Sequence, residues 1–246
     1  MRIVFLEPPL ALEPLGIIPR HPPQYALTAA AVLRDAGHHV ALVDAFHDDL
    51  APAETVRRVL AAAPDLLVVV PYDYTRETQP EVTTEIVRQL SASRSDLVTG
   101  LAGSVDEPHF RRTMGAAPGI AFACIGEYEN TLLAVAAALG VGEAPPRGRG
   151  NPEAVADERT DNGGIDRLAD RLSAVAGLVV RRGNELRSTG PAVVPQDLDE
   201  LPFPAWDLVD FERYIYVPHR FRRSPMYPLL AGRGCPFACL CCKETP

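Results

Sequence analysis

Three cysteines near the end of this 246-residue chain have the spacing of a metal-binding loop. Cys235, Cys239 and Cys242 form a CxxxCxxC pattern, and Gly232 and Gly234 come just before it. Three thiolates on one short loop can hold three irons of a four-iron cubane cluster and leave the fourth iron open. Glycines before the first ligand let the backbone approach the cluster closely. The pattern therefore predicts a reactive iron–sulfur cluster.

A zinc site is the alternative interpretation of the same loop. Cys241 lies between the last two members of the pattern, so four cysteines are available as ligands. Structural zinc sites usually space their ligands as two separated pairs, and this chain has no second pair. We therefore expect an iron–sulfur cluster with Cys241 as a non-ligand. Cys124 lies in the apolar run 120–125 and is expected to be a buried, inert thiol.

Cysteine usage and charge restrict the compartment and the partners. Four of the five cysteines are clustered, whereas a secreted disulfide framework spreads an even number along the chain. The net charge of −8 argues against a nucleic-acid binder. No apolar run reaches the ~20 residues of a membrane span, and the first one is too short for a signal peptide. We expect a cytoplasmic protein without nucleic-acid or membrane partners.

The part of the chain that must position this loop alternates between short apolar runs and helical patterns. The expected strands are 3–7, 39–45, 65–70, 96–102 and 121–125. The expected helices are 22–36, 52–62, 78–92, 107–114 and 128–139. Strands that are apolar on both faces and alternate with helices predict an α/β fold, with a doubly wound, Rossmann-like parallel sheet.

Ligands of such sheets bind at the carboxyl ends of the strands. Several residues there are small or backbone-rich, which suits the approach of a large planar ligand. The candidate ligand-binding residues are Pro8, Pro9, Tyr72, Asp73, Tyr74, Thr75, Gly103, Ser104, Gly126, Glu127, Tyr128 and Glu129. No GxGxxG follows the first strand and no GxxxxGK[ST] is present, so neither a dinucleotide nor a P-loop nucleotide is expected.

After residue 140 the pattern changes. Residues 141–163 are rich in proline, glycine and charge, which indicates a linker or an insertion. The elements expected beyond it are a helix over 164–175, a hairpin over 177–187 with its turn at Gly183-Asn184, a proline-stiffened connector over 197–207, and a strand over 227–231. This last strand would deliver the cysteine loop.

Taken together, these motifs resemble the cobalamin-binding subgroup of radical S-adenosylmethionine (SAM) enzymes. Residues 233–242 are similar to the cluster motif of the family, and residues 197–207 to the connector before it. Residues 126–132 (Gly-Glu-Tyr-Glu-Asn-Thr-Leu) resemble a Gly-Glu-x-Glu-x-Thr-Leu motif at the fifth strand. Residues 30–44 resemble the first helix and second strand. Only residues 141–176 have no counterpart.

The resemblance implies three segments and three cofactors. Residues 1–140 would be a cobalamin-binding domain, 141–205 a linker with insertion, helix and hairpin, and 206–246 the start of a radical SAM (β/α) barrel. Cobalamin would contact the strand-end residues given above, while Cys235, Cys239 and Cys242 would hold a 4Fe-4S cluster that binds SAM. The Asp-x-His-x-x-Gly motif of other cobalamin domains is absent, so His47 is not expected to ligate cobalt.

The implied activity is that of a cobalamin-dependent radical SAM enzyme. A 5′-deoxyadenosyl radical would abstract hydrogen from an unactivated carbon of a small-molecule or peptide substrate, and a methyl group would then be transferred. A flavodoxin- or ferredoxin-like donor would supply electrons. The alternatives are a non-methylating cyclase or rearranging enzyme, and a cobalamin carrier or sensor without catalysis. The chain ends four residues after Cys242, so this chain alone is expected to be inactive.

The ligand assignment makes a direct prediction. Anaerobic reconstitution of the chain should incorporate about four irons and four sulfides. C235A, C239A or C242A should each abolish incorporation because each removes a thiolate ligand, whereas C241A should not. Iron and acid-labile sulfide analysis measures this. If C241A lost the cluster while C242A kept it, the ligand assignment would be wrong.

Overall fold

The apolar runs of the N-terminal half pair as one parallel sheet in a computed structural model. The structure describes residues 1–9, 21–71, 79–103, 107–140, 162–214, 227–230, 232 and 233. The parallel strands are β1 (Arg2–Glu7), β2 (His39–Asp44), β3 (Leu66–Val69), β4 (Val98–Leu101) and β5 (Ile120–Cys124). Their order across the sheet is β2-β1-β3-β4-β5. The predicted doubly wound α/β fold is confirmed.

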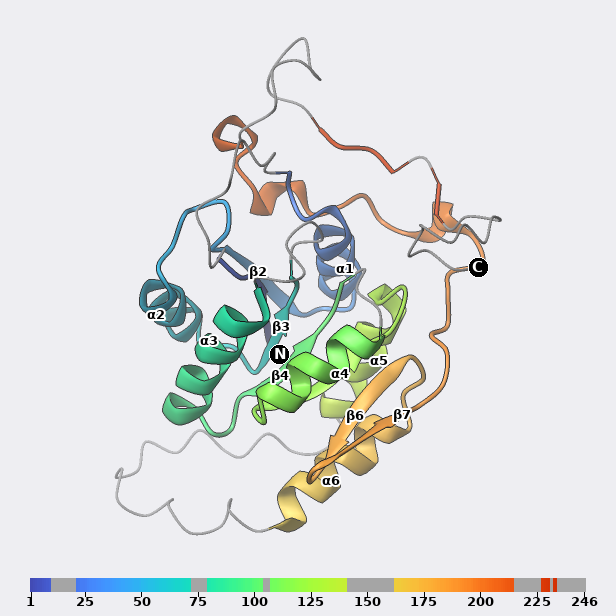
Figure 1. Cartoon of the computed structure of the whole chain (residues 1–246). Helices are drawn as coiled ribbons and strands as arrows, with labels where there is room; N and C mark the ends of the chain where they lie inside the picture. The colour runs from blue at the N-terminus through green and yellow to red at the C-terminus, as the bar shows by residue number, and fades with distance from the viewer. Residues whose placement is uncertain are drawn as a thin grey trace.

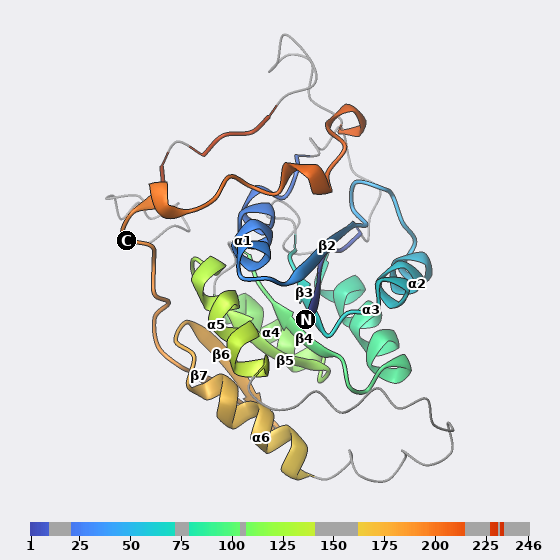
Figure 2. The same ribbon diagram turned by 180° about the vertical axis from the view of Figure 1, so that it is seen from behind.

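Helices cover both faces of this sheet (Figure 1; reverse view in Figure 2). One face packs against α1 (Gln24–Asp35) and α5 (Glu129–Gly140), the other against α2 (Pro52–Ala62), α3 (Gln79–Ser93) and α4 (Glu107–Ala116). Because side chains alternate along a strand, β1 buries Ile3 and Phe5 on the first side and Val4 and Leu6 on the other. No helix in the described ranges is long and apolar enough to cross a membrane.

An antiparallel hairpin extends the sheet beyond β5. Its strands are β6 (Leu178–Arg182), which pairs with β5, and β7 (Glu185–Ser188), which pairs with β6. The turn uses Gly183 at φ 57°, as the sequence predicts. Helix α6 (Asn162–Ser173) packs against this hairpin and contributes to the same core as α1 and α5. The hairpin, expected within the linking segment 141–205, is thus continuous with the sheet of the first 140 residues.

The C-terminal part of the described chain crosses over α1 as an irregular connector with three short 3-10 turns. These are η2 (Leu198–Glu200), η3 (Trp206–Leu208) and η4 (Phe211–Arg213). Ala205 is buried, and its N–H donates to the carbonyl of Leu27 in α1 at 3.0 Å. Arg34 of α1 also donates to Asp207 at 2.8 Å. The connector is therefore attached to the sheet domain along α1.

The strand predicted over 227–231 is not found. Residues 227–230 are irregular, Leu229 is 83% exposed, and no described strand hydrogen-bonds to them. A strand is stable only beside a partner strand, and the described residues provide none at this position. The prediction was wrong for these four residues, and residue 231 lies outside the described part of the chain.

The contact between β4 and β5 depends on the absence of a side chain at residue 100. Gly100 lies opposite Phe122 in the parallel pair, and a Cβ at this glycine would overlap the fully buried Phe122 ring. Gly115, on an exposed position of α4, has open space around the same atom. The two glycines therefore differ in whether they can accept a methyl group.

We predict that G100A lowers the free energy of unfolding by ~1–3 kcal/mol, because the added methyl overpacks the sheet. As the matched control, G115A should raise it by about 0.5–1 kcal/mol through helix propensity. Urea unfolding of both variants measures the difference. Equal effects of the two substitutions would contradict the close approach of Phe122.

Candidate functional site

The carboxyl ends of the parallel strands form one edge of the sheet, and the C-terminal segment contacts both sides of this edge. Tyr214 reaches the end of β2 and Arg233 reaches the end of β5. Between these strands lie β1, β3 and β4. β2 and β3 lie on opposite sides of β1, so the strand order reverses there, and folds of this kind bind ligands at such a point.

A pair of carboxyl groups, one of them buried, closes β1 and β2. Glu7 and Asp44 are the last residues of these strands and are register partners. Glu7 is only 2% exposed, and burial, followed by the charge of Asp44 and its hydrogen bond, raises the pKa of Glu7 well above its usual range. The neutral, protonated form of Glu7 is therefore favoured. Its Oε2 atom is buried and has no hydrogen-bond partner among the described residues.

Asp44 is held by the segment that follows it and by the connector. One carboxylate oxygen accepts the N–H of His47 at 2.8 Å, and the other accepts the hydroxyl of Tyr214 at 2.5 Å. The rings of His47 and Tyr214 stack with centroids 3.9 Å apart. Burial and then the nearby Asp44 carboxylate raise the pKa of Tyr214, so its hydroxyl remains a donor. One face of the His47 ring is thus occupied by a protein ring.

An aromatic group continues this contact outward from the sheet. The ring centroids of Trp206 and Phe211 are 5.3 Å apart, and those of Phe211 and Tyr227 are 4.0 Å apart. Arg213, next to Tyr214, pairs with Asp48 at 2.7 Å. Trp206 therefore packs against the other aromatic rings of the connector. The group fixes the connector over the end of β2.

A second pair of acidic residues follows β5, and its negative charge is balanced by an arginine. Gly126 turns the chain at φ 76°, and Glu127 and Glu129 follow it. Their carboxylates accept from the guanidinium of Arg233 at 3.1 and 2.7 Å. Burial lowers the pKa of Arg233, but hydrogen bonds and charge from Glu129 and then Glu127 raise it to a net value above the ordinary one. Arg233 therefore stays charged.

Tyr128, between these two glutamates, points into the core. It is 2% exposed, and burial raises the pKa of its hydroxyl well above the usual value. Its oxygen has no hydrogen-bond partner in the described part of the chain, as is also true of Glu7 Oε2. Buried polar atoms are nearly always satisfied, by protein, water or ligand. A ligand rich in amides could satisfy such groups as donor and as acceptor.

The structure places some of the predicted site residues at this edge. Pro8 and Pro9 are buried directly after β1, and Gly103 is buried after β4 at φ 146°. The predicted site residues that lie outside the described residues are Tyr72, Asp73, Tyr74, Thr75, Ser104, Cys235, Cys239 and Cys242.

Four of the residues that make up this edge are not among the site residues predicted from the sequence. They are Glu7, Asp44, Tyr214 and Arg233. The sequence contains one indication for Glu7, since it is a carboxylate at the end of an otherwise apolar strand. The contact between Arg233 and Glu129 joins residues 104 positions apart, and no local pattern announces such a contact.

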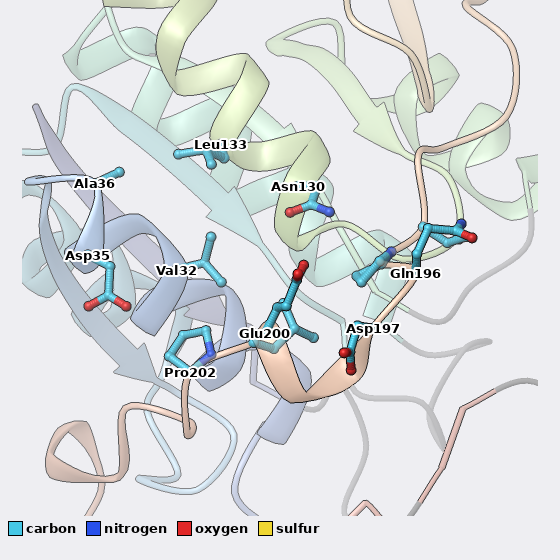
Figure 3. Close-up of a pocket in the computed structure, with 12 residues that line it drawn as sticks. Val32, Asp35, Ala36, Asn130, Leu133, Gln196, Asp197, Glu200 and Pro202 are labelled. Carbon is cyan, nitrogen blue, oxygen red and sulfur yellow. The ribbon is translucent and has the colours of Figure 1, made fainter.

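The larger of two described cavities lies away from the strand ends. It has a volume of ≈ 530 Å³ between α1, α5 and the connector, and its wall includes Val32, Leu133 and Glu200 (Figure 3). A smaller cavity of ≈ 210 Å³ lies beside Asp44 and Tyr214. Buried Glu7 and its partner Asp44 are at the strand ends, so we assign the candidate site there rather than to the larger cavity.

Comparison with known proteins relates this chain to cobalamin-binding proteins. Residues 19–136 match the family model described as the B12 binding domain. Anaerobic magnesium-protoporphyrin IX monomethyl ester cyclases are similar over 99% of this chain: that of Synechocystis sp. is 29% identical and that of Rubrivivax gelatinosus 27%. The chain spans 42% and 39% of these relatives, about two fifths of their length.

One solved structure shares the fold. It is the cobalamin-dependent S-adenosylmethionine radical enzyme OxsB, solved with aqua-cobalamin bound. The likeness has a TM-score of 0.52 at 16% sequence identity and covers 84% of this chain and 24% of that one. At this identity the likeness supports the fold alone.

The raised pKa of Glu7 predicts a pH-dependent stability. A carboxyl with a raised pKa in the folded state stabilises it fully only below the unfolded pKa, and this contribution is lost as pH rises. E7Q removes this dependence. We expect the stability of E7Q relative to the natural chain to increase between pH 5 and 7.5, by at most about 1.4 kcal/mol per pH unit.

The matched control is E54Q. Ion pairs with Arg57 and Arg58 lower the pKa of exposed Glu54 to about 2, so this residue does not titrate above pH 5. Its effect on stability should therefore be constant over the same range. Urea unfolding at each pH measures both differences. A pH-independent effect of E7Q would show that Glu7 has an ordinary pKa in the folded chain.

Proposed function

Since residues 19–136 belong to the B12-binding domain family and the chain is homologous to cobalamin-dependent radical SAM enzymes, we propose that this chain binds cobalamin at the carboxyl ends of its parallel strands. The observation that carries the proposal is the edge itself. It combines a reversal of strand order at β1 with two buried polar atoms, on Glu7 and Tyr128, that lack protein partners in the described ranges.

The residues of this edge fit a corrin with amide side chains. The proton of Glu7 is used in its hydrogen bond to Asp44, so the free Oε2 of Glu7 can accept a hydrogen bond from an amide N–H, and the hydroxyl of Tyr128 can donate or accept. Pro8, Pro9 and Gly103 offer backbone without bulky polar groups, which suits a large ring. Cobalamin, when bound, supplies a cobalt centre that can carry a methyl group. The role of this chain is to hold and orient it.

For the whole protein, we propose a cobalamin-dependent radical SAM enzyme, with Cys235, Cys239 and Cys242 as cluster ligands. Methyl transfer to an unactivated carbon is the reaction that the motifs favour. We propose that this chemistry takes place in a reducing cytoplasm, which the clustered thiols favour, and that a flavodoxin- or ferredoxin-like protein donates the electrons. A carrier or sensor without catalysis remains the alternative, and it would need no cluster.

A non-methylating reaction is the second candidate, and one observation favours it. Both relatives described above are named cyclases and match nearly the full length of this chain. The two candidates differ in the fate of the methyl group of SAM. With the whole protein, methyl-labelled SAM and magnesium-protoporphyrin IX monomethyl ester as the probe, label in the porphyrin product would favour methylation. Unlabelled cyclised product would favour the cyclase reading.

The cobalamin proposal predicts a defined spectrum and a defined contact. The 246-residue chain should bind hydroxocobalamin at about one per chain with the absorbance of the base-off form, and H47A should leave that spectrum unchanged. Y128F should weaken binding roughly 2–10-fold, because it removes one hydrogen bond to the ligand. Without cobalamin the same variant should not lose stability, since the hydroxyl has no described protein partner.

Equilibrium titration followed by absorbance measures these affinities. If the natural chain gave a histidine-ligated spectrum that H47A abolished, the assignment of His47 would be wrong. If Y128F bound cobalamin as tightly as the natural chain, Tyr128 would be a core residue and not part of the site.

A further inference from the structure

Arg233 is held on the sheet domain by a closed set of contacts. Its guanidinium donates to Glu127 at 3.1 Å and to Glu129 at 2.7 Å, and it lies over the ring of Tyr25 with its central carbon 5.2 Å from the centroid. The side chain of Arg233 is 10% exposed and that of Glu129 only 1%. Three residues from α1, the end of β5 and the start of α5 thus enclose one cation.

This arrangement differs from the other ion pairs described. Arg57 and Arg88 pair with glutamates of their own helices and are 70% and 67% exposed. Such surface pairs contribute little to stability. Buried Glu129 instead needs a counter-charge, because a carboxylate left unpaired in the interior is strongly unfavourable. Arg233 supplies that charge from a position more than a hundred residues away.

Arg233 lies close in sequence to the cysteine loop, so its contacts with the two glutamates also restrain the start of that loop. It is two residues before Cys235, the first cysteine of the CxxxCxxC loop. One oxygen of Glu127 and one of Glu129 already accept hydrogen bonds from Arg233, so these oxygens are not free to bind a ligand at the strand ends. Their placement explains why two acidic residues follow Gly126 without invoking a cofactor.

We propose that Glu127 and Glu129 are positioning residues for the cysteine loop, which they anchor to the end of β5 through Arg233. The proposal rests on the proposed function only in taking that loop as the cluster loop. The two carboxylates fix where the loop begins, relative to the edge at which we place cobalamin. Sequence reasoning had assigned these glutamates to cofactor binding, and the geometry points to this second role.

Limited trypsin digestion of the full chain tests the anchor without any cofactor. Trypsin must take the side chain of residue 233 into its own pocket, and an arginine enclosed by two carboxylates is released only by local opening. The peptide that begins at Gly234, followed by mass spectrometry, should form slowly from the natural chain. From E127Q/E129Q it should form at least about tenfold faster, because the neutral amides no longer hold the cation.

The matched control is E54Q/E85Q, which neutralises two half-buried glutamates that pair with arginines of their own helices. This double variant should cleave after residue 233 at the natural rate. R233K retains a trypsin site and one positive charge but cannot fork between two carboxylates, so its rate should be intermediate. If E127Q/E129Q does not fold, as judged by circular dichroism, E127Q alone serves, since Glu127 is 26% exposed.

A spectroscopic measurement separates positioning from simple structural support. After anaerobic reconstitution, the visible absorbance of the cluster should decay several-fold faster in air in E127Q/E129Q than in E54Q/E85Q. Equal cleavage and decay rates in the two double variants would overturn the proposal. If no iron is incorporated into the natural chain while the cleavage rates still differ, the anchor holds and the proposed cluster fails. Iron incorporation with equal cleavage rates would reject the anchor alone.

Discussion

Parallel pairing of β1 with β2 on one side and β3 on the other is the constraint on which the candidate site depends. Parallel neighbours must end at the same edge, so Glu7 and Asp44 come side by side without any side-chain interaction to bring them there. The chain runs from β1 to β2 on one side and then to β3 on the other, and ligands of such sheets bind at the point where the strand order reverses. The positions of Glu7 and Asp44 therefore follow from the strand pairing.

The two acidic pairs at this edge solve the same problem in different ways. A carboxyl group cannot be buried as an isolated charge at acceptable cost. At β1 and β2 the solution is a proton, because Glu7 is favoured in its neutral form beside Asp44. At β5 the solution is a distant arginine that remains charged. The first solution leaves a hydrogen-bond donor within the domain, whereas the second binds a remote segment of chain to it.

Sequence patterns were sufficient for elements whose signals are local. Helix α2 begins at Pro52 and ends at Ala62 as predicted, because proline in the first turn and an amphipathic pattern mark its limits. Strand β3 was readable because all its residues are apolar and buried. The pairing of β6 with β5 was not readable, since it depends on which sheet edge is open in the folded chain.

The candidate site divides in the same way. Strand ends such as Pro8 and Gly126 could be located once the strands were known. The role of Glu127 could not, because a carboxylate at a helix start is equally suited to the helix dipole, a ligand or a remote cation. Residues 227–230 show the opposite failure, in which an apolar run that contains Pro228 has no described strand beside it to pair with.

The burial of Cys124 determines which thiols of the folded chain can react. It lies at the end of β5, fully buried, and burial raises the pKa of its thiol far above the ordinary value. Thiolate is the form that reacts with oxidants, alkylating agents and metal ions. While the sheet is folded, this sulfur is therefore silent toward reagents in solution. Any thiol reactivity of the native chain then reports on the four cysteines between positions 235 and 242, which can be counted and labelled without mutating the fifth.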